Sequence, residues 1–329
     1  MGKVYKGKKT KKLERGIAYP TCVSPGELLM NFAPLSDESR ALKDGETVRV
    51  DLGCHINGYV AHAGTTIVVS ADPTSKISGD VAEVIKGGWD TLQLAIRTLV
   101  FGKKNTDVTE MILKASEQYG LEPFPGTYSH KHNRHTLDEN TIIMNKNMPD
   151  KREETYEFDK GDVFGLDVFV TKGTGKAVLS EVRTTVFKRA LQNTFQLKSK
   201  MARTFFNEVD EKYPSLPFSI NGFENMTTAK LGVKHCVDNE LLEPHEVTEI
   251  KDGEVSRFCV TVAITQTGTS IMCGNNFFHS DRYETDKSVE DKELADLLAL
   301  SMDMKDQKQR AKDAKRAAKA EEDKKEDAE

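Results

Sequence analysis

Apolar residues recur along the middle of the chain at two spacings, which predict strands and helices within one region. In the strand-like segments β-branched and aromatic residues are frequent and turn-forming residues lie at the ends. The first two segments are separated by Gly53 to Asn57, and the third and fourth read as a hairpin joined by Lys172 to Gly175. The segments are Thr47–Leu52, Gly58–Val69, Asp162–Thr171, Ala177–Lys188 and Arg257–Thr265.

Four segments have helical spacing instead. The first, Asp80–Val100, keeps its apolar positions on one face despite Gly87 and Gly88. The second runs from Val108 to Tyr119, with Gly120 as its stop. Two more helices are expected around 197–213 and 229–242. Helices and strands in this mixture predict an α+β fold.

The chain divides into three parts by composition. Residues 1–16 form a basic N-terminal arm, and residues 17–285 hold the predicted fold, with a small helical insert at about 190–250. Residues 286–329 are a charged tail that turns from helical to disordered.

Charge and hydropathy narrow the class of protein. Thirty per cent of the residues are charged, the mean hydropathy is −0.53, and no apolar stretch approaches the length of a membrane span. The basic start lacks an apolar core, so it is not a secretory signal. The five cysteines are scattered without a CxxC pair, which favours a reducing compartment.

Although the net charge of the chain is −5, two segments near its ends are basic. Residues 1–15 contain seven Lys or Arg and one acidic residue, and residues 305–319 contain seven Lys or Arg and two acidic residues. Charge without aromatic residues binds phosphates rather than bases, although a solubility tail or a nuclear localisation signal explains it equally well. The candidate nucleic-acid-binding residues, including a third group at the start of the insert, are Lys8, Lys9, Lys11, Lys12, Lys198, Lys200, Arg203, Lys308, Arg310, Lys312, Lys315, Arg316 and Lys319.

One set of motifs resembles a known family. Asp51-Leu52-Gly53-x-His55-x-x-Gly58, Ser129-His130, Asp167 and Cys259 follow the order of the methionine aminopeptidase "pita-bread" fold. The closer resemblance is to its non-peptidase branch, the ErbB3-binding, proliferation-associated proteins, known in fungi as curved DNA-binding protein. It covers about residues 13–300, and the chain begins later than the family pattern, so we expect an N-terminal helical portion to be missing. The segments that carry the resemblance to the branch are Gly16–Thr21, Arg183–Arg189, Ala202–Val209 and Glu240–Pro244.

The resemblance places the peptidases' metal ligands on residues of this chain. Their Asp, Asp, His, Glu and Glu fall at Asp51, His62, His130, Asp167 and Cys259. A bridging ligand needs lone pairs for two cations about 3.5–4 Å apart, which a neutral imidazole at position 62 does not offer. Asp167 is one methylene too short, and the first catalytic histidine of the peptidases falls at Asn31, so a proton-handling group is lost. The expectation is a pseudoenzyme without a catalytic residue, metal or cofactor.

Two rival interpretations of these residues stay open. His62, His130, Cys259 and a carboxylate are an acceptable tetrahedral set for one zinc ion. A residual metallo-aminopeptidase that removes N-terminal methionine is the other. His132 and His135, which follow His130, are interpreted as solvated loop histidines rather than as a metal cluster.

The resemblance also implies a function. It implies an adaptor that binds structured RNA, including the large ribosomal subunit near the peptide exit, with DNA as a variant. It implies a role in ribosome biogenesis, translation or growth regulation, in the nucleus, nucleolus and cytoplasm. The insert would contribute to the RNA contact. A protein–protein scaffold in transcription or signalling, whose binding survives high salt and nuclease, is the alternative from another class.

Overall fold

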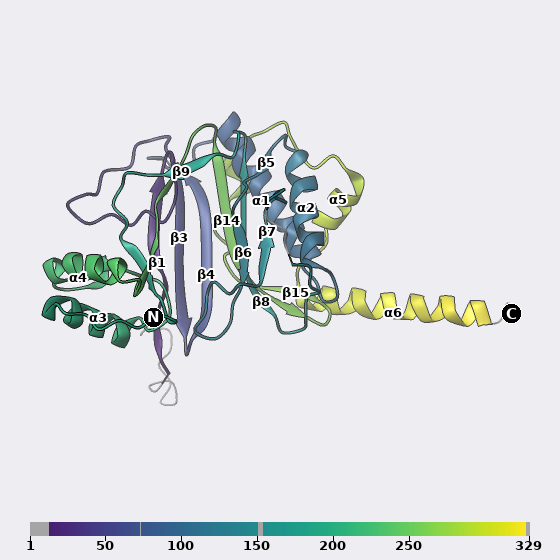
Figure 1. Ribbon diagram of the computed structural model, residues 1–329. Helices are drawn as coiled ribbons and strands as arrows, with labels where there is room; N and C mark the ends of the chain where they lie inside the picture. Colours follow the sequence, from purple (N-terminus) through teal and green to yellow (C-terminus); the bar gives the residue numbers. More distant parts are fainter. Residues whose placement is uncertain (1–12, 73, 151–153, 327–329) are drawn as a thin grey trace.

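A large antiparallel sheet with helices packed on one face organises the molecule (Figure 1). The computed structural model describes residues 13–72, 74–150 and 154–326, and in the last helix the side chains of Lys315 and of residues 317–326 are outside that description. The predicted α+β class is confirmed.

Within these residues the main sheet has nine strands. Its order is β1-β3-β4-β14-β8-β6-β7, with β15 paired to β14 and β5 paired to β8. The strands are β1 (Arg15–Pro25), β3 (Thr47–Ile56), β4 (Tyr59–Val68), β5 (Glu122–Pro123), β6 (Tyr128–Lys131), β7 (Ile142–Met144), β8 (Val163–Thr171), β14 (Val255–Thr265) and β15 (Gly268–Cys273).

The turn between β3 and β4 is tighter than the sequence suggested. β3 continues to Ile56, so only Asn57 and Gly58 connect the strands, with φ of 53° and 81°. An Asn-Gly pair with positive φ at both positions is the preferred two-residue hairpin turn. This turn sets a register in which Asp51 lies opposite Gly64 and Gly53 lies opposite His62.

The predicted hairpin between 162–171 and 177–188 is wrong. Both edges of β8 are already occupied, by β14 on one side and by β5 and β6 on the other. The second segment therefore divides between two small sheets, β2-β13-β9 and β11-β10-β12. Their strands are β2 (Leu28–Met30), β9 (Ala177–Leu179), β10 (Val186–Arg189), β11 (Phe218–Ser219), β12 (Leu242–His245) and β13 (Thr248–Ile250).

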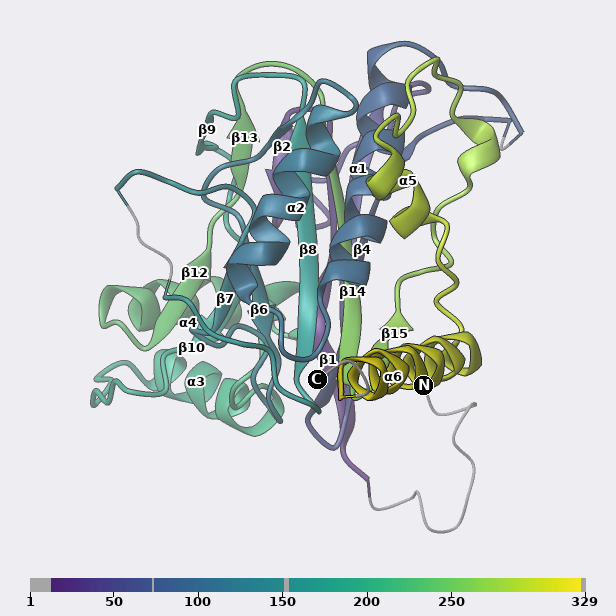
Figure 2. The same ribbon diagram turned by 90° about the vertical axis from the view of Figure 1, so that its right-hand side faces the viewer.

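The helices gather in two places. Figure 2 shows α1 and α2 in front of the main sheet with α5 beside α1, whereas α3 and α4 form a separate pair. The helices are α1 (Asp80–Thr98), α2 (Asn105–Glu117), α3 (Lys200–Lys212), α4 (Met226–Asp238), α5 (Lys292–Leu298) and α6 (Met304–Glu326), with short 3-10 turns η2 (Ile220–Gly222) and η3 (Ser280–Arg282).

The glycine pair in α1 marks a close approach to the sheet. A side chain at Gly88 would overlap Ser256 and press on Val170. The helix accepts the weak propensity of glycine because its backbone packs directly on β14 and β8 there. The main core lies between this helix and the sheet, and includes Ile85 and Val260.

The predicted insert has its own apolar core. Phe205, Phe218 and Phe223 pack together with Leu241, and a side chain at Gly232 would overlap Phe205, so α3 and α4 lie in close contact. No helix in the described ranges is both long and apolar enough to cross a bilayer. All five cysteines are free thiols.

Candidate functional site

Four neighbouring strands, β3, β4, β14 and β8, bring four of the five aligned positions toward one face of the sheet. Residues directly opposite each other in a strand pair share a face, and their diagonal neighbours are within reach of long side chains. Asp51 on β3 is diagonal to His62 on β4, through the pairs Asp51–Gly64 and Gly53–His62. On the next two strands Cys259 pairs with Asp167.

A residue that the sequence analysis missed occupies the centre of this face. Arg257 of β14 is only 6% exposed, and its Nε and Nη2 donate to Asp167 Oδ1 and Oδ2 at 3.0 and 2.6 Å. Its Nη1 donates to Asp51 Oδ2. The guanidinium also lies over the Phe169 ring, 5.0 Å from its centroid. One cation therefore joins the two retained carboxylates and ties β3, β14 and β8 together.

His62 and Cys259 complete the cluster. His62 Nε2 lies 2.6 Å from Asp51 Oδ1, and Nδ1 lies 3.5 Å from Cys259 Sγ. Burial, followed by the Asp167 carboxylate, raises the pKa of the Cys259 thiol well above its ordinary value, so the thiol keeps its proton. A protonated thiol is a poor metal ligand.

Asp51 and Arg257 each stabilise the charged form of the other. Burial alone would raise the pKa of Asp51, but the Arg257 guanidinium and the His62 ring outweigh it and lower that pKa to about 2. Burial alone would lower the pKa of Arg257, but the Asp167 and Asp51 carboxylates outweigh it and raise that pKa well above its ordinary value. The cluster is thus a charged pair network at neutral pH.

This donor set does not fit the two metal ions of the peptidases. Asp167 Oδ1 and Asp51 Oδ2 each accept a hydrogen bond from Arg257, which occupies lone pairs that a metal ion would need. A divalent cation about 4 Å from the guanidinium would be repelled by on the order of 8 kcal/mol at an effective dielectric constant of about 20. In the part of the chain that the structure describes, no three His, Cys, Asp or Glu side chains converge as a metal-binding group. The four residues of the zinc alternative are not brought together either.

The position of the lost catalytic histidine has become a structural contact. The Tyr19 hydroxyl donates to Asn31 Oδ1 at 2.5 Å, and Asn31 Nδ2 donates to the Glu246 carbonyl at 2.9 Å. Both ends of the amide are therefore satisfied. The Tyr19 ring lies 5.1 Å from that of His62, so aromatic packing fills the space beside the cluster.

One of the two loop histidines after β6, His132, differs from the expectation. His132 is buried rather than solvated, because it packs over Gly165, where a Cβ would overlap its ring. The centroid of the His132 ring lies 6.3 Å from that of His62. His130, the residue aligned with a metal ligand of the peptidases, instead donates from Nδ1 to the Glu139 carbonyl at 2.9 Å. Burial, then His62 and His130, lower the pKa of His132 to about 3, so it is neutral.

The low pKa of Asp51 predicts a pH dependence of stability. A carboxyl whose pKa falls from 3.8 to about 2 on folding stabilises the protein above about pH 4, and this contribution is lost as the pH falls through 2. Because Asn does not titrate, the stability difference between the wild type and Asp51→Asn should shrink by about 2 kcal/mol over that interval. Urea unfolding at a series of pH values measures it, and a constant difference would contradict the ion pair.

The basic candidates lie at two separate ends of the molecule. Lys198, Lys200 and Arg203 are exposed at the start of α3, and Arg203 Nη1 donates to the Leu197 carbonyl at 2.9 Å. Figures 1 and 2 both place α3 and α4 away from α6, which leaves the opposite end of the sheet. The insert and the tail therefore do not form one continuous patch.

Residues of the first turns of helix α6 fix it to the rest of the fold. Buried Gln307 donates through Nε2 to the Thr269 and Met302 carbonyls at 2.9 and 3.0 Å, and Arg310 donates to the Ser301 carbonyl at 2.7 Å. Lys308, Lys312 and Arg316 are exposed one turn apart, on one face of the helix. Lys8, Lys9, Lys11 and Lys12 lie outside the described residues, as do the side chains of Lys315 and Lys319.

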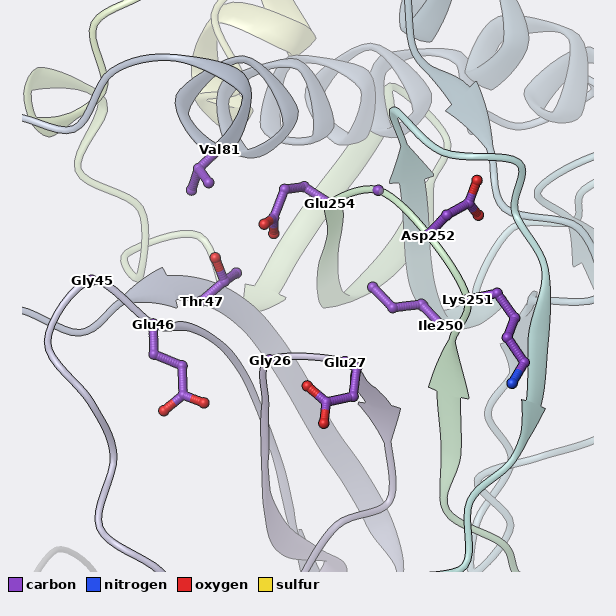
Figure 3. Close-up of a pocket in the computed structure, with 11 residues that line it drawn as sticks. Gly26, Glu27, Gly45, Glu46, Thr47, Val81, Ile250, Lys251, Asp252 and Glu254 are labelled. Atoms are coloured by element: carbon purple, nitrogen blue, oxygen red, sulfur yellow. The ribbon is translucent and has the colours of Figure 1, made fainter.

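A surface pocket on another part of the molecule is lined by more acidic than basic side chains, whereas the candidates on the insert and the tail are basic. Its volume is about 380 Å³, and Figure 3 shows the carboxylates of Glu27, Glu46, Asp252 and Glu254 around one opening, which Lys251 also lines. Like charge would repel a phosphate backbone from this face. This pocket is therefore a poor site for a phosphate-bearing ligand.

Comparison with known proteins gives consistent matches. The model of metallopeptidase family M24 matches residues 2–186. Proliferation-associated protein A of Dictyostelium discoideum is 36% identical over 270 residues, covering 82% of this chain and 70% of that protein. The curved DNA-binding protein of Schizosaccharomyces pombe is 33% identical over 322 residues, covering 96% and 82%. The solved structure of a thermophilic Arx1 has a TM-score of 0.81 and 26% identity, covering 92% of this chain and 86% of that one.

Proposed function

Because the chain belongs to metallopeptidase family M24, in the branch of the ErbB3-binding, proliferation-associated and curved DNA-binding proteins, we propose that it is a non-catalytic adaptor for structured RNA. The aminopeptidase scaffold would supply a rigid platform. The insert and the C-terminal helix would supply contacts to phosphates.

The position of Arg257 is the main observation in favour of a protein without peptidase activity. Its guanidinium binds Asp51 and Asp167, the two carboxylates that remain of the peptidase set. The peptidases need metal ions there to generate the attacking hydroxide and to polarise the substrate carbonyl. With a fixed organic cation between the carboxylates, this chemistry has no place to occur.

The nucleic-acid part rests on exposed cations without acidic partners. Among the ion pairs of the described residues none involves Lys198 or Lys200, whereas Arg189 nearby is paired with Asp210 at 2.8 Å. Unpaired lysines are available for phosphates, and each phosphate contact releases counterions from the nucleic acid. Lys308, Lys312 and Arg316 offer a second such surface on α6.

The family resemblance supplies the finer proposal. It implies the large ribosomal subunit as the RNA partner, a role in ribosome biogenesis, translation or growth regulation, and nuclear, nucleolar and cytoplasmic pools. The name of the S. pombe curved DNA-binding protein supports DNA as a second nucleic acid, and the name of the potato ERBB-3 binding protein 1 supports an additional protein partner. Phosphate contacts alone do not distinguish RNA from DNA.

We expect Lys198→Ala/Lys200→Ala to weaken binding to large ribosomal subunits or structured RNA without unfolding the protein. On duplexes each lost phosphate contact should reduce the slope of log affinity against log salt by about 0.9, so two contacts should remove nearly 2. Cosedimentation with large subunits over a salt series measures both effects. Arg203 is left unchanged because it holds the preceding loop in place.

The matched control is Lys103→Ala/Lys114→Ala, which removes two exposed lysines near α2, on the far side of the sheet from the insert. This variant should bind like the wild type. Equal binding by both double variants would contradict the role of the insert. Binding that survives high salt and nuclease treatment would favour the protein scaffold instead.

A further inference from the structure

The loop Leu191–Gln196, at the start of the insert, is exposed along its whole length but held at both ends. At one end the Ala190 N–H donates to the Leu241 carbonyl at 3.0 Å. At the other end Arg203 Nη1 donates to the Leu197 carbonyl, and the Leu197 side chain is buried in the insert core. The loop is therefore presented to solvent in a defined place.

An exposed aromatic side chain belongs to this loop. The Phe195 side chain is 51% exposed, and the residues around it are the uncharged hydrogen-bonding residues Gln192, Asn193, Thr194 and Gln196. Aromatic rings stack on nucleobases, and amide side chains hydrogen-bond to base edges. Neither interaction requires a charged side chain in the loop.

The charge around the loop points to an anionic partner. Between Val182 and Asn207 the sequence has six Lys or Arg and no Asp or Glu, in a chain whose net charge is −5. Several of these cations bind carboxylates elsewhere in the fold, as Lys188 does with Asp138 at 2.7 Å. Lys198 and Lys200, next to the loop, have no such partner among the described residues. A ring flanked by free cations favours a nucleotide over an apolar protein surface.

We propose that Phe195 stacks on an unpaired base of the bound RNA while Lys198 and Lys200 contact the flanking phosphates. This inference rests on the proposed function and specifies it further, because it assigns the insert to loops, bulges or single strands rather than to paired helices. Bases within a paired A-form helix are already stacked and offer no free face.

The test uses the full chain and two RNA probes, a hairpin with an unpaired uridine loop and a fully paired duplex. Phe195→Ala should weaken hairpin binding roughly 5- to 150-fold and leave duplex binding unchanged. Phe195→Trp should retain hairpin binding. Lys198→Ala/Lys200→Ala should weaken binding to both probes. Phe101→Ala, which removes an equally exposed ring at 51% exposure, is the matched control and should change neither.

The outcomes separate the inference from the function. A wild type that binds neither probe would overturn both. A wild type that binds both, with Phe195→Ala unchanged or weakened equally on the two probes, would overturn stacking and leave RNA binding intact. If Phe195→Ala bound both RNA probes like the wild type but lost a complex that resists nuclease, base stacking would be overturned in favour of a protein partner for Phe195. A DNA hairpin with a thymidine loop distinguishes DNA from RNA as the source of the base.

Discussion

Replacing Arg257 with methionine is expected to lower the free energy of unfolding at neutral pH by about 3–5 kcal/mol. The substitution keeps much of the apolar volume but leaves Asp51 and Asp167 buried without their cation. Removing one partner of a buried charge network is costly because the remaining charges stay desolvated. Urea unfolding followed by the fluorescence of Trp89, the single tryptophan of the chain, measures the change.

Two variants separate charge from packing. Arg257→Met/Asp51→Asn/Asp167→Asn should recover most of the lost stability, since neutral groups of similar volume replace buried ion pairs at little cost. Arg49→Met is the matched control, because Arg49 is as deeply buried but donates to the Leu28 and Val255 carbonyls rather than to a carboxylate. A triple variant as unstable as the single one would contradict an electrostatic role for Arg257.

Divalent cations are expected to stabilise Arg257→Met and to leave the wild type unchanged. Without the guanidinium the Asp51 and Asp167 carboxylates lack compensation, and a cation in the vacated space would supply it. For a Kd of about 10 μM, 1 mM Mn²⁺ would add about 2.7 kcal/mol to the free energy of unfolding. Unfolding curves with Mn²⁺ and with a chelator measure the difference.

The control for this effect is Arg257→Met/Asp51→Asn, which has one carboxylate fewer and should lose the response to Mn²⁺. Arg257→Lys keeps a positive charge in the site and should respond no more than the wild type. A wild type stabilised as strongly as Arg257→Met would contradict the account, because it would mean that the guanidinium does not exclude metal.

Much of the fold could be predicted from the sequence, because local patterns and the family resemblance agreed. The pita-bread fold and the branch of the ErbB3-binding, proliferation-associated and curved DNA-binding proteins are confirmed. Helix α1 was predicted to within two residues of its end, since its apolar spacing is regular. The hairpin after β8 was wrong because strand partners depend on which edges are already occupied, and the pattern of one segment does not contain that information.

The site was predicted only in part. The resemblance located Asp51, His62, Asp167 and Cys259, but it assigns only positions that the peptidases use, so it could not indicate Arg257. A signal was present nonetheless. Arg257 is the single charged residue of β14 and Asp167 that of β8, and two lone opposite charges in apolar strands predict a buried pair. The burial of His132 followed from Gly165 on another strand, which only the register reveals.

The arrangement of the basic segments bears on how an adaptor would work. Helix α6 spans 23 residues, roughly 35 Å, and leaves the sheet at the end opposite the insert. Two surfaces so far apart would contact different parts of a large RNA rather than one short duplex. When one surface is bound, the other is held at a high effective concentration near its own site on the same particle, which raises the overall affinity. Removing the cations of either surface should therefore weaken binding to a large particle more than binding to a short RNA.

The central claim is that a guanidinium stands between the carboxylates that hold metal ions in the peptidases. Titrating the wild-type protein with Co²⁺, while following visible d–d absorption and methionine release from a Met-Ala-Ser peptide, tests it most directly. The account predicts neither cobalt absorption bands at one or two equivalents nor released methionine. Saturable bands at stoichiometric cobalt together with methionine release would contradict it.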